Sequence, residues 1–486
     1  MIPRMATLSD TGGQNNCCKF LQSATRVILG AALFLVGIFA LIGVAVWNGF
    51  PIVFFDSFWY ILSALHGFND GQKSLGYAEF LHWTEIGRSL WSVILAQAIC
   101  VYFVLKMTGK VFGLHLQRHK QALLIFALVL TRSLSWEVSH LLPDVFTAVA
   151  VLCLFLLLTE AASFSSHEKA GISALFILSF SVHASNYLLL SGLFAAALMR
   201  ALVSRRRGFL LRILILPAVL LFCSFSFVIA LNKASTGRVY LHSTSHVFIG
   251  NRLIEDGIAQ KLLKEHCSDT PYILCKYADS LSTNRLNFLF SHPETFNAIG
   301  GWTKSSGAFE PIIRDSLRYY PWEVIKESFK QAGEQLIVFH IADFIFRMSE
   351  DRRAAYMLIM LKTDYPNEYA AFMASKQQQK KLSSSALARF HDWVVCICAA
   401  LIPLLYRRVK PSLKAPLLEL ICLCSAAIFL NAFICGALSH FEPRYGSRVI
   451  WLVPLCAFLA FGSWQSSRAS HETKKHQATP EGCFEP

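Results

Sequence analysis

Long apolar stretches recur along the whole chain and are separated by short basic clusters or longer polar segments. A membrane-spanning helix needs about 20 predominantly apolar residues, and the sequence contains about ten stretches that approach this length. They lie at about 27–47, 88–107, 121–136, 144–160, 170–182, 187–203, 210–231, 393–406, 416–438 and 449–464. The pieces 170–182 and 187–203 are short for separate spans, so tilted and partly re-entrant forms both fit. The pattern predicts an all-α polytopic membrane protein with about ten transmembrane helices.

The order of apolar and polar stretches predicts five regions. The first apolar block is too long for the core of a cleaved signal peptide, so we interpret it as a retained anchor. The regions are a cytoplasmic tail 1–26, an N-terminal transmembrane catalytic module 27–231 with outer loops 48–87 and 136–143, a soluble outer domain 232–392, C-terminal transmembrane helices 393–464, and a cytoplasmic basic tail 465–486.

Helical periodicity extends into the predicted outer domain. Apolar residues recur at three- and four-residue spacing over Asn251–Glu265 and Pro321–Met348, so the domain is expected to be mostly helical. The stretch Lys376–Ser385 is rich in Gln, Lys and Ser and is expected to be a hydrophilic linker.

The composition indicates a membrane protein, and the distribution of charge predicts how the chain is oriented in the membrane. Hydrophobic residues make up 54% of the chain, which is far from a soluble enzyme of this length. The formal net charge of +14 would suggest nucleic-acid binding in a soluble protein, but here basic residues cluster in short loops between apolar blocks. With the N-terminus inside, every strong basic cluster falls on one side of the membrane, as the positive-inside rule predicts. No nucleic-acid partner is expected.

Two cysteines, Cys267 and Cys275, are the only ones in the predicted outer domain. Their short spacing suits a disulfide in an oxidising periplasm or lumen, and two unpaired thiols are the alternative. No Asn-x-Ser/Thr acceptor occurs in the sequence, which favours a bacterial inner membrane with a periplasmic active site over the endoplasmic reticulum membrane of a eukaryote.

The first candidate site follows the first apolar block, at the run 54–60. If this stretch is helical, Asp56 and Tyr60 share one face because they are four residues apart. A partly desolvated carboxylate can act as a general base towards an acceptor hydroxyl. The alternative is an ordinary cap of an interfacial helix.

The second candidate site is the next outer loop, with Glu137, His140 and Asp144. These side chains can face Asp56 across the bundle, although an acid after a proline is also typical of helix capping. A divalent cation held by Asp56, Glu137 and His140 is one option, but no metal-spaced motif such as H-E-x-x-H is present. No cofactor is predicted with certainty.

The third candidate site precedes the last apolar block and contains Arg444, Tyr445 and Arg448. Arginine at the mouth of a bundle can hold a phosphate through charge-assisted bonds, or it can extend to lipid headgroups. Arg88 is a secondary candidate of the same kind. His183 lies at an outer tip, where it contacts either a substrate or only solvent.

Together these places resemble the GT-C superfamily of integral-membrane glycosyltransferases, in the branch of the aminoarabinose and protein mannosyl transferases. Asp56 with Tyr60, Pro143 with Asp144, and Arg444 with Tyr445 match three motifs of that branch in order and side, while Ser57 replaces its usual second acid. The resemblance covers residues 27–231 and the terminal spans.

The resemblance implies a function for the candidate residues. It implies inverting transfer of a sugar from a polyprenyl-phosphate donor to a glycan, glycolipid or protein acceptor. Asp56 would be the base, aided by Glu137 and Asp144. The donor phosphate would contact Arg88, Arg444 and Arg448, and the substrates would contact Tyr60, His140, His183 and Tyr445.

Three other functions remain open from the sequence. One is a scaffold, for which the conjunction of the three candidate sites would be a coincidence. An oligosaccharide ligase or polymerase also has many spans and a large outer loop, and it would depend on basic loop residues such as Arg252 or Arg285 in place of Asp56. A non-enzymatic transporter would place charged residues near the middle of its spans, whereas most charges here lie at the ends.

Overall fold

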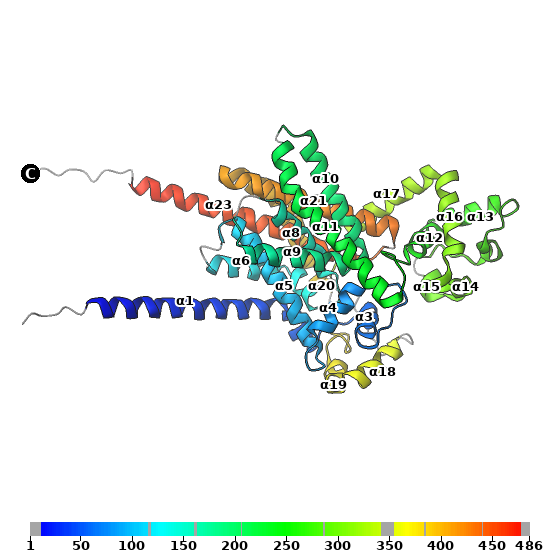
Figure 1. The fold of residues 1–486 in the computed structure, drawn as a ribbon, viewed down its shortest axis with the longest axis horizontal. Coiled ribbons are helices and arrows are strands. Elements are labelled where there is room, and N and C mark those ends of the chain that lie inside the picture. The colour runs from blue at the N-terminus through cyan, green and yellow to red at the C-terminus, as the bar shows by residue number, and fades with distance from the viewer. Residues whose placement is uncertain are drawn as a thin grey trace, which may run out of the picture.

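The computed structural model describes residues 11–114, 118–159, 163–205, 207–284, 287–341, 354–382, 385–439 and 441–477, and these are almost entirely helical. Figure 1 shows a bundle of long helices with a group of short helices at one end. The N-terminal helices are α1 (Thr11–Leu41), α2 (Gly43–Asn48), α3 (Phe55–His66), α4 (Leu75–Thr84), α5 (Leu90–Val111), α6 (Arg118–Leu130), α7 (Ser133–Ser139), α8 (Val145–Leu158), α9 (Ser166–Ser181), α10 (Ala184–Val203) and α11 (Arg207–Thr236).

The remaining helices complete the bundle and form the group at its end. They are α12 (Ser245–Glu255), α13 (Ile258–His266), η2 (Ile273–Ser280), η3 (Asn287–Ser291), α14 (Glu294–Ala298), α15 (Gly301–Lys304), α16 (Ser306–Tyr319), α17 (Pro321–Ile337), α18 (Ala354–Asp364), α19 (Pro366–Ala374), α20 (Ser385–Arg408), α21 (Pro411–Leu438), α22 (Pro443–Ile450) and α23 (Leu452–Gln477). We call the group α12–α16 the side module.

Six helices among the described residues are long and apolar enough to cross a membrane, which indicates a multi-pass membrane protein. They are Leu90–Val111, Ala184–Val203, Arg207–Thr236, Ala386–Arg408, Pro411–Leu438 and Pro443–Gln465. The predicted count of about ten is not confirmed.

Local features of the backbone account for part of the difference between the six candidate spans and the predicted count of about ten. The predicted span 121–136 is divided between α6 and α7, which meet at an angle of 83° and together could make a seventh span. Arg132, between them, adopts the left-handed region with φ of 71°. The predicted spans 27–47 and 144–160 keep only the shorter apolar helices Val27–Leu41 and Val145–Leu158.

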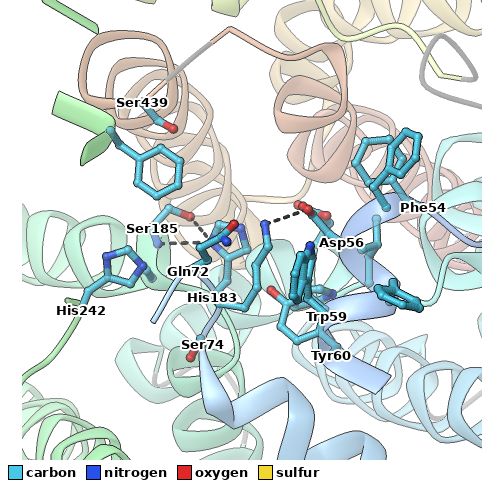
Figure 2. Close-up of a pocket in the computed structure, with 18 of the residues that line it drawn as sticks. Phe54, Asp56, Trp59, Tyr60, Gln72, Ser74, His183, Ser185, His242 and Ser439 are labelled. Carbon is cyan, nitrogen blue, oxygen red and sulfur yellow. Dashed lines mark hydrogen bonds and ion pairs between the residues drawn. The ribbon is translucent and has the colours of Figure 1, made fainter. Parts of the chain in front are cut away.

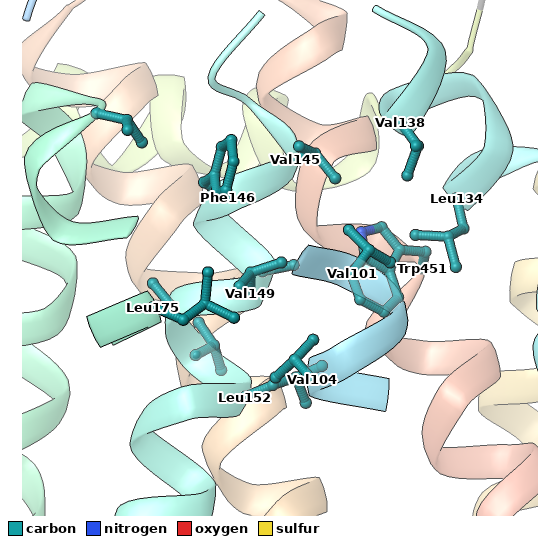
Figure 3. Close-up of a cluster of buried hydrophobic side chains, with 14 of the residues drawn as sticks. Val101, Val104, Leu134, Val138, Val145, Phe146, Val149, Leu152, Leu175 and Trp451 are labelled. Carbon is teal, nitrogen blue, oxygen red and sulfur yellow. The ribbon is translucent and has the colours of Figure 1, made fainter. Parts of the chain in front are cut away.

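Two large apolar cores lie in the described part of the chain, beside a small third cluster around Trp136. The larger core belongs to the bundle, and α8 is at its centre: its residues are apolar on every face and almost all of them are buried. Figure 3 shows this core between α5, α7, α8, α9 and the start of the last span, with Val149 and Trp451 among its members. The smaller core holds the side module together around Phe296 and Phe309. The stretch 232–392 is shared between both cores, because Met357 and Phe372 of α18 and α19 pack against the bundle.

A buried connection between distant segments fixes the start of α3. Ile52 forms a bridge to His140, and its amide donates to the Ser139 carbonyl at 2.9 Å. On its other side, the Gln377 side chain accepts from the Val53 amide at 3.2 Å and donates to the Val53 carbonyl at 2.6 Å. The expectation of a hydrophilic linker at 376–385 is therefore wrong for Gln377, which is buried and acts as a partner for extended backbone. Residues 383–384 of that stretch lie outside the described residues.

Candidate functional site

A large cavity of about 1380 Å³ opens where the bundle meets the side module. Its wall is formed by α3, the following loop, the starts of α8, α10 and α22, the end of α21, and parts of α12 and α18. Figure 2 shows Asp56, Tyr60, His183 and His242 around this space. Of the residues predicted for the site, those that line it are Asp56, Tyr60, Asp144, His183, Arg444 and Tyr445.

Asp56 is held between two cations from distant parts of the chain. Its Oδ1 lies 2.7 Å from the Lys73 Nζ, and its Oδ2 accepts a hydrogen bond of 2.5 Å from the Arg444 Nη2. Burial by itself would raise the pKa of Asp56, but the charges of Lys73 and Arg444 outweigh that effect and hold the pKa well below its usual range. Asp56 is therefore ionised at neutral pH.

The helix start that carries Asp56 is ordered by Ser57. The Ser57 hydroxyl accepts from the amide of Phe54, the residue before the helix, at 3.0 Å. Ser57 is fully buried, and its hydroxyl satisfies a backbone amide at the start of α3. This is the position that would hold a second acid in the branch that the sequence resembles. Tyr60, one turn further on, packs edge-on against Tyr77 with ring centroids 4.8 Å apart. Burial, and then the charge of Asp56, raise the pKa of Tyr60, which keeps its hydroxyl protonated.

Asp144 lies between Arg444 and Arg448, so positive and negative side chains alternate from Asp56 into the bundle. Its Oδ2 lies 3.7 Å from the Arg444 Nη1, and its Oδ1 accepts from the Arg448 Nη1 at 3.0 Å. Burial would raise the pKa of Asp144, yet the two arginines hold it below its usual range. The side chain makes no capping hydrogen bond to α8, so its local position at the helix start is used for the ion pairs.

Arg448 does not line the cavity and supports Asp144 from behind. It is fully buried, and its Nη2 donates to the Asn431 Oδ1 at 2.7 Å and to the Ser185 Oγ at 2.9 Å. The ring of His183 lies 3.3 Å from the Arg448 Nη1. Burial and the Arg448 charge lower the pKa of His183 to about 3, so this ring is neutral at pH 7.

The connected charges are three cations and two carboxylates: Lys73, Asp56, Arg444, Asp144 and Arg448. Arg444 is mostly buried, and its Nε has no hydrogen-bond partner within the described part of the chain. Its guanidinium also stacks over the Phe54 ring, 4.6 Å from the centroid. Within this chain of ion pairs the cations outnumber the carboxylates by one, and a buried donor without a hydrogen-bond partner among the described residues favours an anionic ligand.

Three other predicted residues lie away from the cavity. Glu137 is buried and accepts from the Ser447 hydroxyl at 2.6 Å. His140 is buried with its Nδ1 2.8 Å from the Trp136 carbonyl, and burial lowers its pKa to about 4. Arg88 has a 63% exposed side chain that extends to Glu85 at 3.9 Å.

The proposed metal ligands do not converge. Asp56 lines the cavity, whereas Glu137 and His140 do not. Among the residues that the structure describes, no group of three or more His, Cys, Asp or Glu side chains is arranged to hold a metal ion.

Lys73 is the site residue that sequence reasoning missed. It ends a polar loop in which Asn69 and Asp70 accept from backbone amides two residues ahead, as in Asx turns. The next residue, Ser74, donates to the Ser181 carbonyl and so attaches the loop to the bundle. A usable signal existed, because Lys73 is the only lysine or arginine within residues 48–87, on the side where the positive-inside rule disfavours them.

The remaining sequence predictions concern Cys267 and Cys275 and the basic residues Arg252 and Arg285. Cys267 and Cys275 form a disulfide in the module. Arg252 is buried and paired with Glu255 at 2.9 Å and with Asp256 at 2.5 Å, away from the cavity wall. Arg285 lies outside the described residues.

In comparisons with known proteins, no family model, curated protein or solved structure matches the chain.

Proposed function

We propose that this chain is a membrane glycosyltransferase that moves a sugar from a polyprenyl-phosphate-linked donor to an acceptor hydroxyl, by a single displacement that inverts the anomeric carbon. The observation that carries the proposal is the carboxylate of Asp56, held between Lys73 and Arg444 at the polar end of a large, mostly apolar cavity. This arrangement brings together a base, two cations that can bind phosphate, and space for a lipid chain.

Lys73 and Arg444 suit the phosphate of the donor. When the bond between the anomeric carbon and the phosphate oxygen breaks, its electron pair stays on that oxygen and the lipid phosphate gains one negative charge. Two cations that are already positioned stabilise this charge as it develops. The Arg444 Nε, which has no hydrogen-bond partner among the residues that the structure describes, provides a further donor for a phosphate oxygen.

Asp56 suits the proton transfer. The acceptor oxygen forms the new bond to the anomeric carbon, and its proton passes to a carboxylate oxygen of Asp56. A carboxylate that is paired with two cations is a weak base. A bound phosphate competes for Lys73 and Arg444, which raises the pKa of Asp56 when the donor is in place. Donor binding therefore prepares the base.

The apolar part of the wall suits the polyprenyl chain. The residues that provide it come from α3 and α18 and include Phe55, Trp59, Leu62, Met357 and Met360. Across the cavity, the side module contributes Phe248 and Trp302, which suit the acceptor. On this assignment Arg448 and Glu137 hold neighbouring side chains in position and do not contact substrate.

The proposal includes the side of the membrane on which the site lies. The basic clusters of the sequence assign the α3 end of the bundle to the outer face, and the disulfide of the side module fits an oxidising compartment. A bacterial inner membrane with the cavity towards the periplasm satisfies both features.

A complementation experiment tests the proposal. A deletion strain of the native host receives the wild type, Asp56→Asn or Glu79→Gln, and its envelope glycans and glycolipids are compared by mass spectrometry. Glu79 is an exposed carboxylate of α4 outside the cavity wall, so its variant is the matched control. The wild type and Glu79→Gln should restore a product larger by one sugar, and Asp56→Asn should not. Full restoration by Asp56→Asn at normal protein level would show that the base is misassigned.

A further inference from the structure

One face of α17 carries large apolar side chains that the protein leaves uncovered. Trp322 is 79% exposed and Phe329 is 58% exposed, and Ile325 and Leu336 are exposed beside them. At 100° per residue these four positions fall within one narrow arc of the helix. Soluble proteins seldom expose an apolar stripe of this kind without a partner for it.

An adjacent face of α17 is packed against α21, a candidate membrane-spanning helix. Figure 1 shows α17 beside α21, between the bundle and the side module. The contact is close, because a Cβ added at Gly436 of α21 would lie 2.6 Å from the Gln331 carbonyl oxygen of α17. Gln335 donates to the Glu442 carbonyl at 2.9 Å and fixes the end of the helix. The exposed stripe therefore has a defined position relative to a candidate span.

The stripe continues an apolar surface of that span. The rings of Phe329 and Phe433 lie 5.5 Å apart, so the two helices share aromatic surface. One turn before Phe433, Phe429 is 52% exposed on α21, where a spanning helix faces lipid. The polar edge of α17 starts at Lys326 and Lys330, directly beside the stripe.

We propose that α17 is an interfacial membrane helix, with Trp322, Ile325, Phe329 and Leu336 inserted into the bilayer next to α21. Three observations support lipid as the occupant: the aromatic continuity with α21, the tryptophan near the helix start, and the flanking lysines, whose stems can lie along apolar surface while their charges reach headgroups. The proposal does not depend on the glycosyltransferase assignment.

The bilayer would thereby hold the side module in position. The Lys261 Nζ of the module lies 2.5 Å from the Glu323 Oε1 of α17, and Gln331 donates to Asp256 at 3.3 Å. Since the module provides part of the cavity wall, lipid contact along α17 limits how far that wall can move.

Photolabelling of the intact chain tests this surface. The wild type is reconstituted into phosphatidylcholine vesicles that contain a phosphatidylcholine with a diazirine on its acyl chain. After irradiation, labelled residues are mapped by mass spectrometry. Phe429 is the positive control, and Ile273, an aliphatic side chain of the module that is 49% exposed, is the matched negative control.

Trp322 and Phe329 should be labelled at a level near that of Phe429 and about tenfold above Ile273, as expected for burial in lipid worth about 1.4 kcal/mol or more. Phe329→Glu should lower labelling of Trp322, because a charge in the stripe disfavours insertion. Labelling of Trp322 and Phe329 no higher than that of Ile273, with Phe429 labelled, would overturn the proposal, since the stripe would then face water or protein.

Discussion

Replacing Lys73 with methionine removes one of the two cations on Asp56 and should weaken the binding of a lipid phosphate. At 2.7 Å and an effective dielectric constant of about 20, the gross attraction between Lys73 and Asp56 is about 6 kcal/mol. Desolvation and side-chain ordering offset most of this attraction, so loss of a partly exposed pair lowers the free energy of unfolding by about 1 kcal/mol or less. Binding of an anion depends on the cation directly.

The binding assay uses farnesyl phosphate and isothermal titration calorimetry in detergent at pH 7.5. Loss of one charge-assisted hydrogen bond costs about 1.5–3 kcal/mol, so Lys73→Met should raise the Kd about 10- to 150-fold. Farnesol, which lacks the phosphate, should bind weakly to wild type and variant alike.

The chain offers a matched control in Lys110. Its Nζ lies 2.7 Å from the Glu168 Oε2, and its side chain is 22% exposed, against 2.7 Å and 23% for Lys73. Lys110 does not line the cavity, so Lys110→Met should lose similar stability and bind farnesyl phosphate like the wild type. Equal weakening by both variants, or a Kd for Lys73→Met within about threefold of wild type, which is under 1 kcal/mol, would refute the reasoning.

Three further predictions concern stability in detergent. Arg448→Met should lower the free energy of unfolding by about 3–5 kcal/mol, because it leaves the buried Asp144 without its closest partner; adding Asp144→Asn should restore part of the loss in thermal unfolding, and no recovery would contradict this role. Gln377→Ala should cost about 2 kcal/mol, since the Val53 amide and carbonyl both lose a buried partner; chemical denaturation measures it, and a loss below about 0.5 kcal/mol would mean that water replaces the side chain. Acidification should destabilise the protein through Asp56 and Asp144: their pKa values are lower in the folded chain, so the stability they add is complete above the unfolded pKa of about 4 and is lost as the pH falls below it. Asp56→Asn should flatten the decline of Tm between about pH 5 and pH 3, and an unchanged slope would exclude Asp56 as a source.

The sequence predicted those features that depend on local spacing. Asp56 and Tyr60, four residues apart, do share the cavity wall, and Arg444, in the first turn of α22, lines it as well. The helical class also follows from apolar periodicity. These features are local, so neighbouring residues determine them.

Features that depend on tertiary contacts were not predictable in the same way. Gln377 lies in a stretch with the composition of a linker, and tertiary contacts make it part of the core. Its side chain makes two hydrogen bonds to Val53, 324 residues away in the chain, and its amide donates to the Asn48 Oδ1. The predicted count of about ten spans is not confirmed, and hydropathy does not detect a break such as the one at Arg132. Arg448 carries the same local signal as Arg444, yet one is fully enclosed and the other lines the cavity, a difference of helix rotation that depends on packing.

The order in which the partners of Asp56 are synthesised determines when each of its ion pairs can form. Lys73 follows it by 17 residues, but Arg444 is 388 residues further along the chain. At about 5–20 residues per second, a growing chain needs about 20 to 80 s to reach that arginine. During this interval Asp56 can pair with Lys73, whereas Arg444 has not yet been made. A chain stopped before α22 would therefore carry an incomplete cavity, and quality-control proteases could distinguish it from the finished protein by this difference.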